Sequence, residues 1–234
     1  MKLRVATHNI CHMGKNPIDR TELFPDGTYR NGYEADMVDL MKRNWKQAYE
    51  SFTADIIGLQ EFHSWFDLGS TIRTEDQVFQ PFGYELFRQD NGLAVASRFP
   101  LVHEVEADFE PVSKRRWQKF RLHLNGREIA VFNTHPTPRD AKIRQKEYEI
   151  LIGEFRKEAC FLAFGDFNAK TADEYEIFRE AGFPMANDGI VTVENGSMCD
   201  NIVASPNVKF ERVDVYDPEF SLSDHAVLYA EVVI

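Results

Sequence analysis

The alternation of apolar and polar residues predicts that much of the chain forms short β-strands. Residues 3–9 alternate in this way, which is typical of a strand with one buried face. Two short apolar runs, 55–59 and 160–164, are typical of strands buried on both faces. Further strands are predicted at 84–88, 93–97, 102–109, 117–124, 129–133, 200–204, 208–215 and 226–233.

Turn residues between two pairs of these segments predict β-hairpins. Asp90-Asn91-Gly92 precedes the strand at 93–97, and Asn125-Gly126 precedes the strand at 129–133. Asn and Gly tolerate the positive φ angles that tight hairpin turns require. The strands on either side of each turn are therefore expected to pair antiparallel.

A helical period of apolar residues appears in fewer segments. The first helix begins near residue 34, and its apolar face is formed by Met37, Met41, Trp45, Ala48 and Phe52. The second runs to about residue 157 from Thr137 as N-cap, with Pro138 at the first position and Asp140 in the first turn. A short helix at 171–181 ends at Gly182. Many strands with two or three longer helices favour two packed sheets flanked by helices.

Two segments fall outside these patterns. Residues 13–33 are rich in Gly, Asn, Pro and Asp, which predicts a long surface loop. Residues 62–83 are mixed and contain a short helix whose ends the pattern does not define. Residues 13–33 and 62–82 are expected to frame the substrate. Because the chain has no internal repeat, low-complexity tract or break in composition, we predict a single domain over residues 1–234.

The composition limits the class of protein. Hydrophobic residues make up 43% of the chain and include 19 Phe, which is enough for a large core. The net charge is −11, and an acidic protein is a poor candidate for coating DNA, although a local basic groove remains compatible with it. Three cysteines without paired spacing disfavour a disulfide framework. No apolar stretch is long enough for a signal peptide or a membrane span, so a cytoplasmic protein without stable membrane association is expected.

Polar residues gather where the predicted strands end. Five such clusters are present: Asn9, Gln60-Glu61, Asn133-Thr134-His135, Asp166-Phe167-Asn168 and Ser223-Asp224-His225. Each one alone is explained as a turn residue that caps its own strand. Strand ends at one edge of a sheet converge in space, however, so the five together indicate one site.

The residue types in these clusters suit metal-assisted hydrolysis of a phosphate ester. Carboxylate and amide oxygens are ligands for hard cations such as Mg²⁺ or Mn²⁺. Hydrolysis requires a positioned water and neutralisation of charge on the phosphate oxygens. Asp, Asn and His side chains can position the water and neutralise the charge without a covalent nucleophile. Zinc is less suited, because no Cys pair has ligand spacing and His135 and His225 are far apart in sequence.

With these residues identified, the sequence resembles the endonuclease/exonuclease/phosphatase superfamily, also called the DNase I-like fold. The resemblance extends from Arg4 to the last strand. Its pieces, in the order of the family, are residues 4–9, 55–61, 92–100, 131–135, 165–169, 199–205 and 222–227, and they include Leu59-Gln60-Glu61, Gly165-Asp166-Phe167-Asn168 and Ser223-Asp224-His225. The resemblance implies an α/β (α+β) fold, a four-layer α/β sandwich of two packed, mostly antiparallel β-sheets flanked by helices.

The resemblance also implies roles for individual residues at the metal. Glu61 matches the main metal ligand of the family. Asn9 matches a residue that contacts the metal site and the phosphate region. Asp224 looks like a second metal-site or water-orienting carboxylate. The implied cofactor is Mg²⁺ or Mn²⁺.

The remaining implied roles are catalytic. Asp166 would orient or deprotonate the attacking water, and Asn168 would bind a phosphate oxygen. His135 and His225 would flank the scissile phosphate and donate hydrogen bonds to it. Asp200 matches the acidic residue that pairs with the last His, raising its pKa and fixing its tautomer. A turn residue at the start of a strand is the alternative for Asp200.

Some features depart from the family or fall outside its motifs. His8 stands where an aromatic residue is frequent, and Pro136 follows His135 where an aliphatic one is frequent; both are expected to lie at the rim of the site. The segment 114–119 (Lys-Arg-Arg-Trp-Gln-Lys) contains Arg116, our candidate cation for binding substrate. An exposed edge strand protected by positive charge is the alternative for this segment.

We therefore predict a metal-dependent hydrolase of phosphoester bonds, a phosphodiesterase or a phosphatase. Its substrate is expected to be a phosphorylated small molecule or a nucleic acid, and no obligate protein partner is predicted. A metal-dependent endonuclease or exonuclease acting on DNA or RNA is the alternative. A catalytically silent binding module of the same fold is disfavoured, because such a protein should lack Glu61, Asp166 or a histidine, and all are present.

Overall fold

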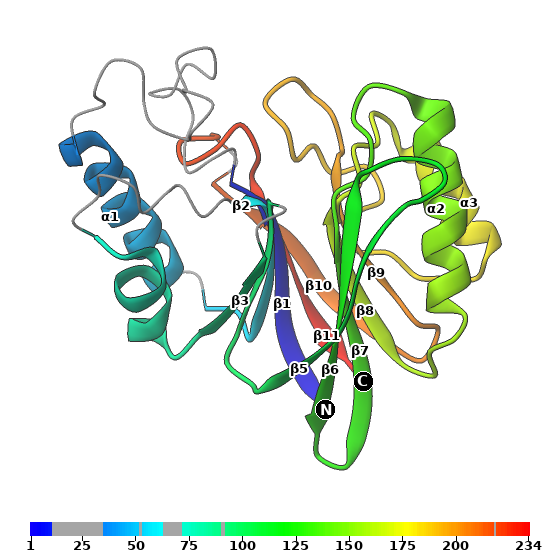
Figure 1. Cartoon of the computed structure of the whole chain (residues 1–234), viewed down its shortest axis with the longest axis horizontal. Helices are drawn as coiled ribbons and strands as arrows, with labels where there is room; N and C mark the ends of the chain where they lie inside the picture. The colour runs from blue at the N-terminus through cyan, green and yellow to red at the C-terminus, as the bar shows by residue number, and fades with distance from the viewer. Residues whose placement is uncertain (11–34, 52, 63–71, 90–91, 218) are drawn as a thin grey trace.

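The computed structural model describes residues 1–10, 35–51, 53–62, 72–89, 92–217 and 219–234 of the chain. The predicted loop at 13–33 and residues 63–71 of the predicted framing segment at 62–82 lie outside the described residues. Two β-sheets pack against each other (Figure 1). The first sheet has the order β10 (Lys209–Tyr216), β11 (Val227–Val233), β1 (Lys2–Asn9), β2 (Ile56–Phe62), β4 (Gly92–Ser97) and β3 (Glu85–Gln89). The second has the order β5 (Leu101–Asp108), β6 (Arg116–Leu124), β7 (Arg127–Thr134), β8 (Phe161–Asp166) and β9 (Asp200–Ala204).

Each sheet contains one parallel pair near its centre. β1 is parallel to β2 in the first sheet, and β7 is parallel to β8 in the second. The other pairings are antiparallel, including the β3–β4 and β6–β7 hairpins predicted from their turns. The carboxyl ends of the four central strands therefore meet at one edge of the sandwich, where the polar clusters of the sequence lie.

Helices cover the two outer faces. On the first sheet lie α1 (Ala35–Ser51), with Trp45 and Tyr49 buried, a π-helical turn (Thr74–Phe79) and a 3₁₀ turn (Gln80–Phe82). On the second lie α2 (Ala141–Phe155), α3 (Glu176–Glu180) and a 3₁₀ turn (Ala172–Tyr175) (Figure 1). The second face is rich in aromatic side chains, among them Phe132, Phe155, Phe161, Phe167, Phe178 and Phe183. The predicted four-layer sandwich is confirmed. No helix among the described residues is both long and apolar enough to cross a membrane.

The core between the sheets contains a buried polar bridge just below the site. Asn133 on β7 donates from Nδ2 to the carbonyls of Leu59 (3.0 Å) and Ala94 (2.9 Å) on the facing sheet, and its Oδ1 accepts from Gln60 Nε2 at 2.7 Å. At Gly58 the two sheets approach so closely that an added Cβ would lie 2.5 Å from Phe164 Cβ. Asn133 and Gln60 thus tie the sheets together instead of facing the site, which explains two of the polar residues at the strand ends.

The predicted start of α2 is wrong. The N-cap is Asp140, whose Oδ1 accepts from the backbone N–H groups of Lys142 (2.9 Å) and Ile143 (3.1 Å). Thr137 does not cap the helix, because its own N–H and hydroxyl bond the side chain of Glu147 at 2.7 and 2.6 Å. The predicted helix at 171–181 is also divided, into a 3₁₀ turn and the five residues of α3.

Candidate active site

Five predicted site residues come together at the edge where the central strands end. Asn9 is the last residue of β1 and Asp166 the last of β8, while His135 follows β7 directly. Asp200 begins β9 and His225 lies just before β11; both strands run antiparallel to their neighbours, so their starts lie at the same edge. Asn9 Nδ2 donates to Asp166 Oδ2 at 2.9 Å and thereby joins the two sheets.

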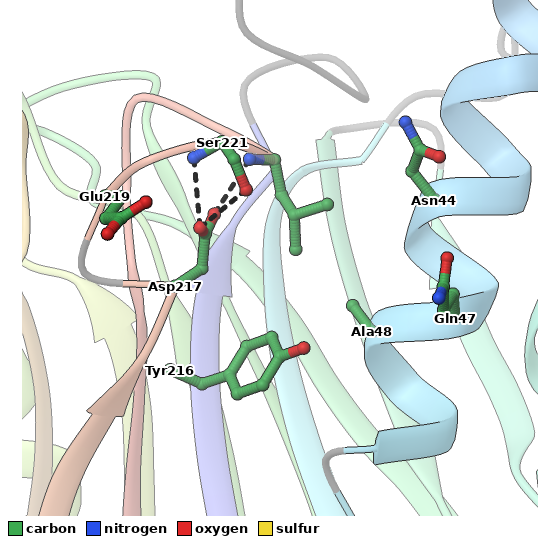
Figure 2. Close-up of a pocket in the computed structure, with 8 residues that line it drawn as sticks. Asn44, Gln47, Ala48, Tyr216, Asp217, Glu219 and Ser221 are labelled. Carbon is green, nitrogen blue, oxygen red and sulfur yellow. Dashed lines mark hydrogen bonds between the residues drawn. The ribbon is translucent and has the colours of Figure 1, made fainter.

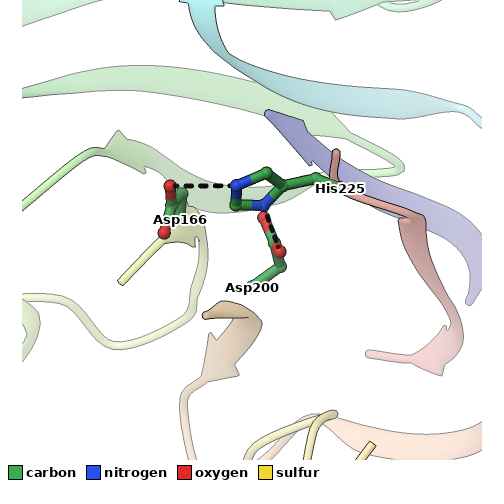
Figure 3. A group of neighbouring side chains, drawn as sticks. All are labelled: Asp166, Asp200 and His225. Carbon is green, nitrogen blue, oxygen red and sulfur yellow. Dashed lines mark hydrogen bonds and ion pairs between the residues drawn. The ribbon is translucent and has the colours of Figure 1, made fainter. Parts of the chain in front are cut away.

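A buried row of ionisable groups runs through this edge (Figure 3). His225 Nδ1 lies 2.8 Å from Asp200 Oδ2, a hydrogen-bond distance, while its Nε2 lies 3.9 Å from Asp166 Oδ2. Asp200, Asp166 and His225 are exposed by only 0%, 2% and 7%. His225 is thus held by Asp200 on one side, and its Nε2–H faces Asp166 at a distance too long for a hydrogen bond.

The charges of this row oppose the effect of burial. Burial alone would lower the pKa of His225, but the carboxylates of Asp200 and Asp166, with a smaller contribution from Asp224, raise it to about 10. For Asp200 burial acts in the other direction and raises the pKa, while the hydrogen bond to His225 opposes this rise. His225 is therefore an imidazolium at neutral pH, with Nδ1–H donated to Asp200.

Asp166 is the acceptor at the centre of the site. Its Oδ1 accepts from the backbone N–H of Asn168 at 2.8 Å, and its Oδ2 lies 3.2 Å from His135 Nε2. Burial would raise the pKa of Asp166, but His135, His225 and the Asn9 amide together hold it below its ordinary value. Asp166 is therefore an ionised carboxylate over the whole neutral range.

The loop after β8 turns Asn168 into the same space. Asn168 has a φ of +59°, in the left-handed region that Asn tolerates better than most residues. Its Nδ2 donates to the carbonyl of Pro136 at 3.0 Å, which ties the β8 loop to the β7 loop. Asn168 is 5% exposed and thus lines the floor of the site.

The cation that the structure brings to the site is Arg115. Its Nη2 lies 3.2 Å from His135 Nε2, its Nε is buried without a hydrogen-bond partner, and it forms no ion pair with any described carboxylate. Arg116, the candidate named from the sequence, instead binds Glu106 Oε1 at 2.9 Å and Asp108 Oδ1 at 2.6 Å. The signal in the sequence was the basic run 114–116, but adjacent residues in such a run point in different directions, and the run alone does not say which one faces the site.

His8 and Pro136 are wrongly predicted as rim residues. His8 is fully buried and its Nε2 donates to the backbone carbonyl of His225 at 3.2 Å, while its ring packs on Trp45 with centroids 4.5 Å apart. Burial, followed by the charge of His225, lowers the pKa of His8 to about 3, so it is neutral. Both residues support the centre of the site, His8 by holding the backbone of His225 and Pro136 by accepting from Asn168.

The predicted metal ligands lie at the ends of neighbouring strands. Asn9 pairs in register with Gln60 on the neighbouring strand, so Glu61, the next residue, lies beside Asn9. Glu61 has a φ of +56° and lies at a β-bulge between Gln60 and Phe62. Such a bulge re-aims a side chain at a strand end. Glu61 and Asp224 are half-buried. This set of oxygen donors fits a hard cation such as Mg²⁺, which would take Oδ1 of Asn9 because Nδ2 is the donor to Asp166.

A different group, Asp166, Asp200 and His225, also has ligand atoms within 4.8 Å of one another. Within this group, Nδ1 of His225 is already hydrogen-bonded to Asp200 Oδ2 at 2.8 Å. A protonated imidazole nitrogen has no lone pair to offer a metal. Of the two ring nitrogens of His225, only Nε2 is therefore left to face a metal in this group.

A polar cavity of about 620 Å³ lies between α1 and the loop that leads into Ser223 and His225 (Figure 2). Its described lining consists of amides, hydroxyls, carboxylates and apolar groups: Asn44, Gln47, Ala48, Tyr216, Asp217, Glu219, Ser221 and Leu222. The carboxylate of Asp217 bonds the backbone and hydroxyl of Ser221 and closes this loop. With no cation among the described lining residues, the cavity is a poor site for phosphate.

A two-sheet sandwich with carboxylates, histidines and amides at the ends of its central strands defines a class of phosphoester-cleaving proteins. The profile of the Endonuclease/Exonuclease/phosphatase family matches residues 6–225, and the chain belongs to this family. The resemblance inferred from the motifs is thereby confirmed. A comparison with curated protein sequences gives no match.

Solved structures share the fold at low sequence identity. An endonuclease/exonuclease/phosphatase from Beutenbergia cavernae has a TM-score of 0.70 and 18% identity, over 100% of this chain and 72% of that one. A mannosyl-6-phosphatase from Bacteroides thetaiotaomicron has a TM-score of 0.67 and 19% identity, over 99% and 100%. D. rerio TDP2 complexed with a single-strand DNA product has a TM-score of 0.67 and 14% identity, over 100% and 99%.

Proposed function

We propose that this chain is a divalent-metal-dependent hydrolase of phosphoester bonds. One observation carries the proposal. His225, an imidazolium, faces the buried carboxylate of Asp166 at 3.9 Å, and His135 links the same carboxylate to Arg115, which forms no ion pair among the described residues. Two positive donors around one water-orienting carboxylate suit an anionic substrate that is attacked by water.

The contacts of His135 support an anion beside Arg115. His135 Nε2 lies 3.2 Å from the donor Arg115 Nη2 and 3.2 Å from the acceptor Asp166 Oδ2. With a proton on Nε2 the ring donates to Asp166 and leaves Arg115 Nη2 without an acceptor among the described residues. Without that proton the ring nitrogen repels Asp166. A phosphate oxygen bound to Arg115 removes the conflict, because His135 is then free to keep its proton toward Asp166 or donate it to the phosphate.

The donors around this position account for the charge that develops in the reaction. The Nε2–H of His225 faces Asp166 at 3.9 Å without a hydrogen bond, so it is available to a non-bridging oxygen of a phosphate bound beside them. Arg115 takes a second oxygen, and the side chain of Asn168, fixed by Pro136, adds a neutral contact. Donors held in a buried site gain strength as negative charge builds up on the phosphate in the transition state.

Asp166 positions the water. Its low pKa makes it a weak base but a strong hydrogen-bond acceptor, so its main role is to orient the water in line with the leaving oxygen. The water oxygen then forms a bond to phosphorus, the bond from phosphorus to the leaving oxygen breaks, and a proton of the water ends on the released alcohol.

We assign the divalent cation, Mg²⁺ or Mn²⁺, to Glu61, Asn9 and Asp224. When bound, such a cation neutralises charge on the phosphate and stabilises the departing oxygen. The two carboxylates supply the negative charge that holds a dication, and Asn9 couples this position to Asp166 through its Nδ2.

A small phosphorylated molecule is our first choice of substrate, and DNA or RNA the second. The net charge of −11 disfavours a long polyanion, because binding to nucleic acid depends on many cation–phosphate contacts. The mannosyl-6-phosphatase and the DNA-bound TDP2 among the structural neighbours support one choice each.

The test is a substrate panel with purified protein: phosphorylated sugars, generic phosphodiesters, RNA and supercoiled plasmid, each with Mg²⁺, Mn²⁺ or EDTA. Turnover should require metal, and Asp166→Ala and His225→Ala should abolish it while the proteins still unfold cooperatively. Activity that survives in both variants, or no turnover of any phosphoester by the wild type, refutes the proposal.

A further inference from the structure

A buried glutamate on α2 bonds both of the loops that bring Arg115 and His135 together. Glu147 has 0% exposure. Its Oε1 accepts from the hydroxyls of Ser113 and Thr137, and its Oε2 accepts from the backbone N–H of Thr137 at 2.7 Å. One side chain from the helix layer therefore anchors two separate segments at the edge of the second sheet.

Each anchored segment leads directly to a site residue. Ser113 Oγ donates to Glu147 and accepts the backbone N–H of Arg115 at 3.1 Å, so the start of β6 is held from the helix. Thr137 lies two residues beyond His135, and its carbonyl also accepts from Arg144 Nη1 at 3.1 Å. The 3.2 Å contact between Arg115 and His135 thus joins the ends of two loops that share one anchor.

The partners of Glu147 are unusual for a buried carboxylate. Within the described part of the chain, they are two hydroxyls and one backbone amide, and no cation bonds it; the neighbouring Arg144 pairs with Glu174 instead. Burial of an acid without a counter-ion is unfavourable, and an apolar residue at such a place often makes a protein more stable. Unlike an apolar residue, the carboxylate of Glu147 accepts three hydrogen bonds, which come from the two segments that contain Ser113 and Thr137.

We infer that Glu147 is a positioning residue that sets the placement of Arg115 against His135. The inference rests on the proposed function, because it assumes that the two side chains act on one phosphate group. Through Ser113 the anchor controls binding of the anion by Arg115, and through Thr137 it controls the orientation of His135 toward the phosphate.

The test separates the two loops. Ser113→Ala releases the Arg115 segment and should raise KM by about three- to tenfold with little change in kcat. Thr137→Val removes only the hydroxyl of the His135 segment and should lower kcat by a similar factor with little change in KM. Glu147→Gln should produce both effects, each by about tenfold. The control is Glu149→Gln, an exposed glutamate on the same helix, which should stay within about twofold of wild type.

A second measurement distinguishes positioning from a general loss of stability. In an Arg115→Gln background, Ser113→Ala should have no further effect on KM, because the side chain that it places is already absent. A merely structural role would leave the effect of Ser113→Ala unchanged in that background. Should Glu147→Gln fail to fold, the two single-loop variants carry the test alone.

Binding of inorganic phosphate, measured by calorimetry, separates failure of this inference from failure of the proposed function. A wild type that turns over no phosphoester but binds phosphate about tenfold more tightly than Glu147→Gln refutes the function and supports the anchor. A wild type that neither hydrolyses nor binds overturns both. Kinetics and phosphate binding that are equal in Glu147→Gln and Glu149→Gln overturn the anchor alone.

Discussion

Replacing Asp200 with Asn should convert a pH-independent site into one that works only at acidic pH. Asp200 Oδ2 accepts from His225 Nδ1 at 2.8 Å, and an Asn side-chain oxygen can accept the same bond. Asp200 Oδ1 has no hydrogen-bond partner among the described residues, so an amide NH₂ in its place breaks no existing bond. The substitution therefore removes a charge and keeps the shape.

The expected magnitude follows from the pKa of His225. The two neighbouring aspartates raise this pKa from 6.5 to about 10 against the effect of burial, which corresponds to roughly 5 kcal/mol in favour of the imidazolium. Without the Asp200 charge, burial acts against Asp166 and Asp224 alone, and we expect the pKa to fall to its ordinary value or below. With a pKa of about 6.5, only about 3% of His225 is protonated at pH 8, compared with nearly all in the wild type.

The assay is kcat/KM between pH 5.5 and 9.5, together with an NMR titration of the His225 ring. Asp200→Asn should be about 30-fold slower than wild type at pH 8 and within about threefold at pH 6. The control is Asp188→Asn, an exposed acid paired with Arg179, which should follow the wild-type profile. The same reasoning applies to stability. Because the folded pKa is raised, the stabilisation from His225 is complete below 6.5 and is lost as the pH rises through about 10.

Two results would refute this reasoning. Equal loss of activity at pH 6 and pH 8 would mean that Asp200 acts by something other than the charge of His225. A wild-type His225 that titrates near 6.5 would mean that the aspartates do not outweigh burial.

Three further outcomes are expected. EDTA should abolish turnover and Mg²⁺ should restore it. Glu61→Gln should raise the metal concentration needed for the half-maximal rate. A rate that does not depend on metal would contradict the ligand assignment. Arg115→Gln should raise KM about tenfold, whereas Arg116→Gln should stay within about twofold of the wild-type KM, since Arg116 is bound by acids on β5. The reverse order would show that Arg116 is the cation that binds substrate, as the sequence predicted. Gly58→Ala should lower the free energy of unfolding by about 1–3 kcal/mol, because the added Cβ would overlap the facing sheet. The control Gly153→Ala meets open space and should not destabilise the protein. Equal stability of the two variants would show that the sheets can move apart.

Most elements of the fold could be predicted because their signals are local. Alternation and short apolar runs identified the central strands, and Asn125-Gly126 identified the hairpin whose turn has φ values of +54° and +75°. The start of α2 was misplaced because Thr137 has the side chain of a good N-cap. Its hydrogen bonds go to Glu147, ten residues further on, so a rule that considers only nearby residues fails there.

The membership of the site was also accessible from the sequence, since its residues sit at strand ends. The structure brings together six residues that the sequence predicts for the site: Asn9, His135, Asp166, Asn168, Asp200 and His225. Their catalytic roles remain predictions. Arg115, Glu147 and the supporting contact of His8 were not found, because a basic run, a helical glutamate and a strand histidine have no distinguishing pattern of their own.

By itself, the sequence determined the order of strands and helices, the polar types at the strand ends and the family. Only the tertiary structure decided which of two adjacent arginines faces the site, why His225 is charged although it is buried, and which buried acid holds the loops. The physical reason is that the first set depends on neighbours along the chain. The second depends on distances of about 3 Å between segments far apart in sequence, where charge and hydrogen bonding in a buried environment outweigh the ordinary preference of each residue.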